Sequence, residues 1–347
     1  MARRPDGPLR TGFTTGACAT AATRAAIELL ITGTCPTRVT IPLPKDGGAS
    51  FEVDQSRAEA GWAEAGIIKD AGDDPDVTHG VTVIARVAPA APGSGITFCA
   101  GEGVGTVTRA GLPIGPGEPA INPVPRQMME AAVAAAGLTD LTITIAIPGG
   151  AKIAEQTWNP RLGIEGGLSV LGTTGIVRPF SCAAWIASIH RGIDVARAAG
   201  LPHVAGCTGA TSETAVQAHL ALPDHGMLDM GDFAGGMLKY LARHPVAKLT
   251  IGGGFGKLTK LAQGHLDLHS ARSQVDFAAL ATLAETLGAD PAPIAHANTA
   301  LEALTLCPAL ASAIAAQARA VAQARVPEIE VAVVVVSRDG VILAEAP

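Results

Sequence analysis

Arginines beside rigid turns are the first residues in this chain whose type and spacing could do chemistry. The stretch from residue 145 to residue 181 holds seven glycines and three prolines, and it places Arg161 and Arg178 next to such turns. A guanidinium held in this way can bind a carboxylate through two parallel hydrogen bonds. A single arginine more often forms an internal salt bridge, so the pattern leaves two interpretations open: a carboxylate-binding loop or internally paired arginines.

A second glycine turn, at residues 251–260, stands between a strand pattern and a helical pattern. Its alternate glycines are Gly252, Gly254 and Gly256. Backbone N–H groups at such a turn, with Lys257 beside them, could bind an anionic or ribose-bearing ligand. The spacing fits neither GxGxxG nor the P-loop, because Leu258 follows the lysine where Ser or Thr is required. Close packing of helix on strand through small residues is the alternative interpretation.

The TGFTTGACA segment at residues 11–19 places hydroxyl groups and glycines at the start of a predicted helix. Thr14 and Thr15 could cap the helix, which would be a purely structural role. They could also bind an anion together with the exposed backbone N–H groups of the first turn. The pattern favours neither role over the other.

The GEGVG motif at residues 101–105 follows a strand pattern and is similar to a nucleotide-binding fingerprint. Such a fingerprint needs a helix after its last glycine, and three closely spaced prolines exclude a helix there. A glycine-rich hairpin and a ligand-facing loop that uses Glu102 and Arg109 remain as interpretations. His265 and His269 stand four apart but lack a third ligand, so no metal site is expected.

The composition narrows the class of protein. The 347 residues carry a net charge of -6 and only 3% aromatic residues, which argues against nucleic-acid binding. No apolar run approaches the roughly 18 residues of a membrane span, and the start of the chain lacks the apolar region of a signal peptide. We therefore expect a soluble, cytoplasmic protein whose six scattered cysteines are buried thiols.

Helical and strand patterns are mixed in the first half of the chain. Residues 11–33 pass from TGFTTG into an alanine-rich part with helical spacing, which precedes two alternating segments that a KDGG turn joins into a hairpin. Strands are expected at 38–43, 51–54, 80–87, 95–101 and 141–148, and a second helix at 123–137.

From about residue 180 helices alternate with strands, which favours a mostly parallel sheet. The terminal strand is expected at 330–340, after two Ala-rich helices that follow the 251–260 turn, and Ser212 is expected to open one of the earlier helices. The fold class is thus an α+β N-terminal part with antiparallel strands, joined to an α/β, Rossmann-like C-terminal part. We expect domains at 1–150 and 151–347, which could intertwine, with the boundary between 145 and 180.

The longest motifs resemble those of the CbiD family, the cobalt-precorrin-5B C1-methyltransferases of cobalamin biosynthesis. The matching stretches are LRTGFTTGACA, GEGVGTVTRAGLPIGPGEPAINPVPRQM, PGGAKIAEQTWNPRLGIEGGLSVLGTTGIVRPFS, MGDFAGGMLKYL, GGGFGKLTKLAQG and His269-Ser270. Their length and unusual composition argue against a chance match, and they span nearly the whole chain. Gly253 stands where the family more often has a histidine, and the CTGATSE turn at 207–213 lacks the family's arginine.

The resemblance implies methyl transfer from S-adenosylmethionine to C1 of cobalt-precorrin-5B, giving cobalt-precorrin-6A. The cobalt would travel with the substrate, so the protein needs no metal ligands of its own. The substrate carries many carboxylates, which suit arginines on rigid loops. The residues expected to bind carboxylates are Arg10, Thr14, Thr15, Arg109, Arg126, Arg161, Arg178 and Lys257.

Methyl transfer from a sulfonium is an in-line displacement that requires alignment and exclusion of water more than a strong acid or base. We expect two turns to hold S-adenosylmethionine. They comprise Gly172, Thr173, Thr174 and Gly175 in one turn, and Gly252, Gly254 and Gly256 in the other. If a base assists, Glu102, Glu118 and His269 are the candidates.

Two other classes of function stay open at this stage. A nucleotide-dependent oxidoreductase could use the same glycine turns, although the missing GxGxxG argues against it. A non-catalytic corrinoid-binding scaffold would bind the macrocycle without using S-adenosylmethionine. The sequence leaves the oligomeric state undecided, and a homo-oligomer is one option.

Overall fold

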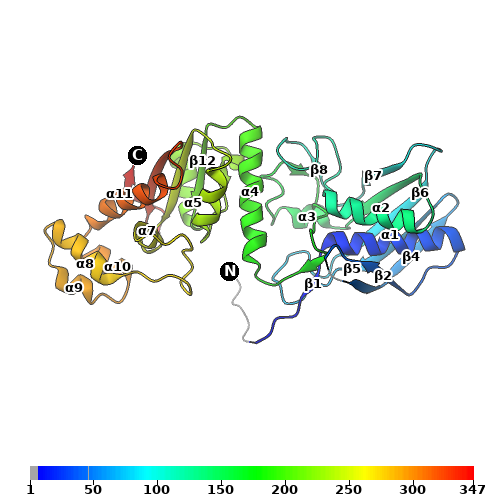
Figure 1. Ribbon diagram of the computed structural model, residues 1–347, viewed down its shortest axis with the longest axis horizontal. Helices are drawn as coiled ribbons and strands as arrows, with labels where there is room; N and C mark the ends of the chain where they lie inside the picture. The colour runs from blue at the N-terminus through cyan, green and yellow to red at the C-terminus, as the bar shows by residue number, and fades with distance from the viewer. Residues whose placement is uncertain (1–6, 46) are drawn as a thin grey trace. The chain divides into compact units, whose positions relative to one another are not determined.

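The computed structural model describes residues 7–45 and 47–347, and the chain divides into two compact units (Figure 1). One unit ends at Ser181 and the other begins at Cys182, one residue beyond the range of 145–180 expected for a domain boundary. Residues 1–6, at the start of the segment judged not to be a signal peptide, and Asp46 of the KDGG turn lie outside the described residues.

The first unit is built on a five-stranded sheet with the strand order β4-β5-β6-β9-β7. Neighbouring strands are antiparallel except for the parallel pair β7 and β9. The antiparallel character expected for this part is confirmed. The strands are β4 (Gln55–Glu59), β5 (Trp62–Ile68), β6 (Thr82–Pro89), β9 (Leu141–Ala146) and β7 (Ile96–Ala100).

Two helices pack on the apolar face of this sheet, α1 (Thr15–Thr32) and α2 (Pro123–Ala135). α1 is alanine-rich, and its small side chains allow it to be buried on nearly all sides. The helix ends at Gly33, which adopts the left-handed conformation with φ 71°. A separate hairpin of β2 (Arg38–Pro42) and β3 (Gly48–Glu52) confirms the expected pairing.

The glycine-rich segments of the first unit are held by two short strand pairs. β1 (Gly12–Phe13) pairs with β11 (Ile176–Val177), and β8 (Thr106–Val107) pairs with β10 (Ile164–Glu165). The short helix α3 (Gly150–Ala154) lies between them in the chain. Residues 150–177 therefore contribute strands to the first unit rather than to the second.

The second unit contains a five-stranded sheet with the order β13-β12-β14-β15-β16. Its first four strands are parallel, and β16 is antiparallel to β15, so the mostly parallel sheet is confirmed. Numbered along the chain the order is 2-1-3-4-5, a doubly wound order different from the Rossmann order 3-2-1-4-5-6. The strands are β12 (His203–Cys207), β13 (Met227–Leu228), β14 (Lys248–Gly254), β15 (Glu330–Val336) and β16 (Ile342–Ala346).

Helices cover both faces of this sheet. On one face, α5 (Ala210–Leu220) packs against the sheet through Val216. On the other face, the remaining α-helices of this unit form its large hydrophobic core. Those helices are α4 (Cys182–Ala198), α6 (Ala234–Leu241), α7 (Phe255–Ala262), α8 (Phe277–Thr286), α9 (Pro291–Ala295), α10 (Ala300–Leu306) and α11 (Leu310–Gln323). The short helix η1 (Asp224–Gly226) contributes to neither core.

Four expectations for the described residues need correction. Four helices, not two, follow α7, because Gly288 and prolines interrupt the alanine-rich run. The expected terminal strand at 330–340 ends at Val336, since a turn at Gly340, with φ 82°, reverses the chain into β16. Ser212 lies inside α5, whose N-cap is Gly209.

The fourth correction concerns the cysteines, which are all free thiols. Three are buried, and the other three are half-buried. The half-buried cysteines are Cys35, Cys99 and Cys182. Among the described residues, no helix is both long enough and apolar enough to cross a membrane.

Candidate functional site

The 171–175 turn docks on the first turn of α1. The Thr14 backbone N–H donates to the Gly175 carbonyl at 2.9 Å, and the Gly16 N–H donates to the Leu171 carbonyl at 2.9 Å. The Thr14 hydroxyl accepts from the Ala17 N–H at 3.2 Å and so caps the helix. The fold therefore brings together two segments that the sequence analysis selected separately, the 171–175 turn and the start of α1. Oxygen atoms of the protein already accept hydrogen bonds from these N–H groups.

Space rather than ligand contact explains the glycines of this turn. A Cβ atom on Gly172 would lie 2.3 Å from the Thr14 hydroxyl, and one on Gly175 would lie 2.6 Å from Leu43. Thr173 is exposed, whereas the Thr174 hydroxyl donates to the Ile176 carbonyl at 3.2 Å. Thr14 and Thr15 are buried, which favours the helix-capping interpretation over an anion site.

Three other glycines of the matched motifs let backbone segments cross. A Cβ atom on Gly103 would lie 1.9 Å from the Ile147 carbonyl oxygen. One on Gly150 or Gly167 would lie 2.4 or 2.3 Å from the Gly103 carbonyl oxygen. Much of the glycine content around 101–105 and 145–181 is thus required by packing.

Two of the selected arginines are used inside the first unit. Arg10 forms an ion pair with Asp70, and this hydrogen bond lowers the pKa of the Asp70 carboxyl to about 2. Arg126 pairs with Glu118 at 2.8 Å and donates to the Ile121 carbonyl at 2.8 Å. Glu118 and Arg126, selected for different roles, therefore neutralise one another.

Arg109 and Arg161 lie on adjacent turns. The Thr108 N–H donates to the Gly163 carbonyl at 2.7 Å, which joins the turns beside the β8–β10 pair. The guanidinium carbon of Arg161 lies 4.5 Å from the centroid of the Trp158 ring. Arg109 is half-buried and makes no hydrogen bond or ion pair with any other described residue.

Arg178 and Glu102 are exposed in the first unit. Arg178 follows β11 directly, and Glu102 accepts a long hydrogen bond of 3.4 Å from the Gly149 N–H. Both remain accessible on their own unit, as a group that contacts substrate requires.

The second unit places the 251–260 turn at the carboxyl ends of the parallel strands. β14 ends at Gly254, and its neighbour β12 leads into Thr208 and Gly209. The chain turns to opposite sides after these two strands, since β12 leads to β13 and β14 leads to β15. The carboxyl ends at such a reversal are where ligands bind in doubly wound folds.

The three selected glycines of this turn have different surroundings. A Cβ atom on Gly252 would lie 2.6 Å from Val216 and 2.8 Å from the Cys207 sulfur, so packing requires this glycine. Gly254 has φ -69°, which any residue can adopt, and no heavy atom lies within 4 Å of its Cβ position. Gly256 has ordinary contact with Ala300 at 3.4 Å.

Lys257 extends across the ends of the two strands. Its ammonium group donates to the Thr208 carbonyl at 2.9 Å and lies 2.9 Å from Oδ1 of the buried Asp232. The lysine therefore already has an internal partner, and Asp232 is a charged residue at the site that sequence reasoning missed. Gly209 was also missed: it adopts an extended backbone, and no heavy atom lies within 4 Å of its Cβ position.

His269 lies in an irregular segment of the second unit, not on a helix. Its Nδ1 accepts a hydrogen bond from the Ala271 N–H at 3.2 Å, so Nε2 is the ring nitrogen that does not take part in this bond. The candidate bases Glu102 and Glu118 belong to the first unit. Within the residues that the structure describes, no group of three or more His, Cys, Asp or Glu side chains could hold a metal ion.

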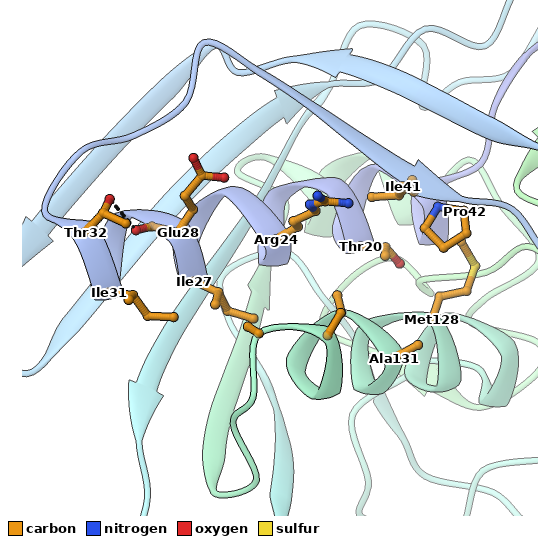
Figure 2. A pocket seen from close by; sticks show the side chains of 13 residues that line it. Thr20, Arg24, Ile27, Glu28, Ile31, Thr32, Ile41, Pro42, Met128 and Ala131 are labelled. Atoms are coloured by element: carbon orange, nitrogen blue, oxygen red, sulfur yellow. Dashed lines mark hydrogen bonds between the residues drawn. The ribbon is translucent and has the colours of Figure 1, made fainter.

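A groove of about 260 Å³ lies between α1 and α2, apart from all of these residues. Figure 2 shows Ile27 and Ile31 of α1 facing the α2 helix that carries Met128 and Ala131. None of the residues selected from the sequence lines this groove.

Comparison with known proteins places the chain among its relatives. Sequence profiles of CbiD and of the CbiD C-terminal domain match residues 2–179 and 267–347. A cobalt-precorrin-5B C(1)-methyltransferase from Brucella anthropi is 60% identical over 350 residues, covering 97% of this chain and 95% of the relative. An enzyme of the same name from Bradyrhizobium sp. is 63% identical over 302 residues, covering 86% of this chain and 80% of the relative.

A crystal structure of the cobalamin biosynthesis protein CbiD from Archaeoglobus fulgidus was also found. It is 28% identical and has a TM-score of 0.42, over 77% of this chain and 84% of that chain. The profile matches and the 60% identity over nearly the whole length show the family. The chain belongs to the CbiD family.

Proposed function

We propose that this protein transfers a methyl group from S-adenosylmethionine to C1 of cobalt-precorrin-5B, giving cobalt-precorrin-6A, in anaerobic cobalamin biosynthesis. The observation that carries the proposal is the 60% identity, over 97% of the chain, to a cobalt-precorrin-5B C(1)-methyltransferase. Cobalt enters as part of the substrate. A cytoplasmic location and a homo-oligomer stay predictions.

The carboxyl ends of β12 and β14 are our proposed site for S-adenosylmethionine. Gly209 and Gly254 support this assignment, because each has an ordinary backbone conformation and an open Cβ position that a side chain would fill. A bare backbone is useful where a ligand approaches closely. We infer that this reversal of strand order in the doubly wound sheet holds the cofactor and that Lys257 and Asp232 lie beside it.

The 171–175 turn, our other cofactor prediction, has weaker support. Contacts with Thr14 and Leu43 account for Gly172 and Gly175, and the N–H groups of Gly16 and Ala17 in the first turn of α1 already have acceptors within the protein. We keep this turn, with Thr173 and Thr174, as a second position to be tested.

The carboxylates of the substrate are assigned to arginines of the first unit. Arg109 and Arg178, whose side chains make no hydrogen bond or ion pair with another described residue, are better supported than Arg10 and Arg126, whose guanidinium groups pair with Asp70 and Glu118. Arg161 keeps its assignment because its turn adjoins that of Arg109. Thr14, Thr15 and Lys257 have the internal roles described above, so we rank them below the three arginines.

The chemistry asks the protein for alignment. S-Adenosylmethionine supplies an electrophilic methyl group, and the ring carbon C1 supplies the electron pair that forms the new C–C bond as the C–S bond breaks. The chain has to orient the two partners in line and exclude water. Glu102, Glu118 and His269 stay candidates for accepting a proton, and no covalent bond to the protein is required.

The test is anaerobic incubation of the protein with cobalt-precorrin-5B and methyl-labelled S-adenosylmethionine. We expect one labelled methyl per corrinoid, located at C1, together with S-adenosylhomocysteine. An intact but unlabelled corrinoid would contradict the assignment. A thermal-shift comparison of S-adenosylmethionine with NAD(P) separates it from a nucleotide-dependent oxidoreductase, because only a methyltransferase should be stabilised by the former.

A further inference from the structure

One turn of the first unit, residues 157–164, supports two of the arginines assigned to the substrate. Asn159 is buried at the centre of this turn and donates from its side-chain amide to the Gly167 carbonyl at 3.2 Å. The Asn159 carbonyl accepts from the Ile164 N–H at 2.9 Å, which closes the turn. Pro160 restricts the backbone between them, so the turn is a rigid support.

Trp158, near the start of this turn, supports Arg161. The guanidinium carbon lies 4.5 Å from the centroid of the indole ring, within the range of a cation–π contact. A planar guanidinium stacked on an aromatic ring has a defined plane, and its outer N–H groups keep a fixed direction. Trp158 therefore limits the rotamers of a long side chain that would otherwise be flexible.

Gly163, near the end of the same turn, supports Arg109. A Cβ atom on Gly163 would lie between 2.4 and 2.7 Å from the Cγ, Cβ and Cδ atoms of Arg109, so the aliphatic stem rests on bare backbone. Gly163 also has φ 72°, which a side chain rarely adopts. The Thr108 N–H bond to the Gly163 carbonyl fixes the register of this contact.

We propose that Trp158 and Gly163, both in the 157–164 turn, are positioning residues that hold Arg161 of the same turn and Arg109 of the adjacent turn, so that the pair binds two carboxylates of a single ligand. The inference rests on the proposed function, because the ligand is taken to be the polycarboxylated corrinoid. Fixing both guanidinium groups before binding reduces the conformational entropy that is lost when the carboxylates dock. The arrangement selects ligands with two neighbouring carboxylates over those with one.

Two double-mutant cycles test the inference on the full-length protein, with cobalt-precorrin-5B as the variable substrate and saturating S-adenosylmethionine. The first cycle uses Trp158→Leu, Arg161→Ala and their combination, with Trp158→Phe as the conservative variant. The second uses Gly163→Ala, Arg109→Ala and their combination. Unfolding in urea is measured for every variant, so that a general loss of stability is detected separately.

We expect Trp158→Leu to raise KM about fivefold with little change in kcat, because the binding free energy of a cation–π contact corresponds to about a fivefold change in affinity. Trp158→Phe should keep KM within about twofold of wild type, because a phenyl ring also stacks on guanidinium. Each arginine-to-alanine change should raise KM at least about tenfold. In the Arg161→Ala background, Trp158→Leu should raise KM no further. In the Arg109→Ala background, Gly163→Ala should likewise raise KM no further.

The inference is overturned if the supporting changes raise KM equally in the presence and absence of their arginines, or if Trp158→Phe is as damaging as Trp158→Leu. It is also overturned if wild type methylates the corrinoid while both arginine variants keep the wild-type KM; the proposed function then stands. Absence of methylation by wild type would instead contradict the proposed function. Should Gly163→Ala not fold, the Trp158 cycle decides alone.

Discussion

Single residues of the same type have different roles in this protein, and their partners explain the difference. Arg10 and Arg126 hold loops of their own unit through Asp70 and Glu118. Arg109 has no such partner among the described residues, and its stem rests on Gly163. Asp70 is 60 positions from Arg10, so no local pattern could have separated a structural arginine from one that faces a ligand.

Two ion pairs on one loop allow a matched prediction about stability. Lys69 is almost fully buried and lies 2.6 Å from Asp76, whereas Arg10 and Asp70 are both largely exposed. Asp76→Asn should lower the free energy of unfolding by about 3 kcal/mol, because it leaves a buried ammonium group without its countercharge. Asp70→Asn should cost about 1 kcal/mol or less, since solvent screens an exposed pair. Urea unfolding at pH 7 measures both.

The exposed Asp54, whose side chain makes no interaction with another described residue, supplies the control as Asp54→Asn. Its free energy of unfolding should match wild type within about 0.5 kcal/mol. Equal effects of Asp70→Asn and Asp76→Asn would contradict the reasoning from burial.

The Asp70 pair also predicts a pH dependence. Hydrogen bonding to Arg10 lowers the pKa of Asp70 from 3.8 to about 2 in the folded protein. A lowered pKa stabilises the fold above the unfolded value, and this contribution is lost as the pH falls through the folded value. The difference in unfolding free energy between wild type and Asp70→Asn should therefore be constant above pH 5 and disappear between about pH 4 and 2. A difference that grows in this range would contradict the assignment.

At the scale of elements, the strand-to-helix turn after β14 combines packing with an open position. Gly252 lies against Val216 and Cys207, while Gly254, two residues later, has free space at its Cβ position. Residues two apart in a strand point to the same face, so the difference arises from their places in the element: Gly252 lies within β14, whereas Gly254 is its last residue and the N-cap of α7. The packing interpretation of this turn thus applies to Gly252, and the ligand-binding interpretation applies to Gly254.

Substituting these two glycines separates the interpretations. Gly252→Ala should lower the free energy of unfolding by about 1–3 kcal/mol, because the added methyl group overpacks the core beneath α5. Gly254→Ala should leave the unfolding free energy within about 0.5 kcal/mol of wild type but weaken binding of S-adenosylmethionine at least about tenfold. Urea unfolding and isothermal titration measure the two effects.

Gly256→Ala, which meets only Ala300 at ordinary contact distance, is the control for a small change in the same turn. Unchanged cofactor affinity in Gly254→Ala would remove the support for this site and favour the 171–175 turn.

At the scale of the whole molecule, each compact unit has its own core. The cores around the β5–β6 and β14–β15 pairs are separate clusters of buried residues. Residues 164–177 supply β10 and β11, whose partners β8 and β1 belong to the first unit. This pairing argues that a fragment cut at residue 150 would separate strands that belong together.

Fragments test this division. The fragment 182–347 should fold alone and unfold cooperatively in urea, because it contains a complete sheet and both of its helical layers. The fragment 151–347 should show the same transition, with residues 151–181 unstructured by NMR for lack of partner strands. A cooperative transition only in the longer fragment would support the boundary near 150 that the sequence suggested. Neither fragment should methylate the corrinoid, since each lacks part of the proposed site.

The accuracy of the sequence-based predictions follows the range of the interactions involved. The caps of α1 at Thr14 and Gly33, the β2–β3 hairpin and the β14–α7 turn were correctly predicted, since each depends on neighbouring residues. The alanine-rich segment after α7 was divided into too few helices, because alanine gives little hydrophobic periodicity to mark where one helix ends.

The sequence by itself determined the family, the antiparallel and parallel character of the two sheets, and the segments from which the site is drawn. Local propensity, hydrophobic spacing and long motifs carry that information along the chain. Only the tertiary structure decided which arginines are paired internally, which glycines make room for protein backbone and which leave space open. Those roles depend on atoms that are distant in sequence, as with Gly103 against Gly167 or Arg109 against Gly163, and become defined only when the chain is folded.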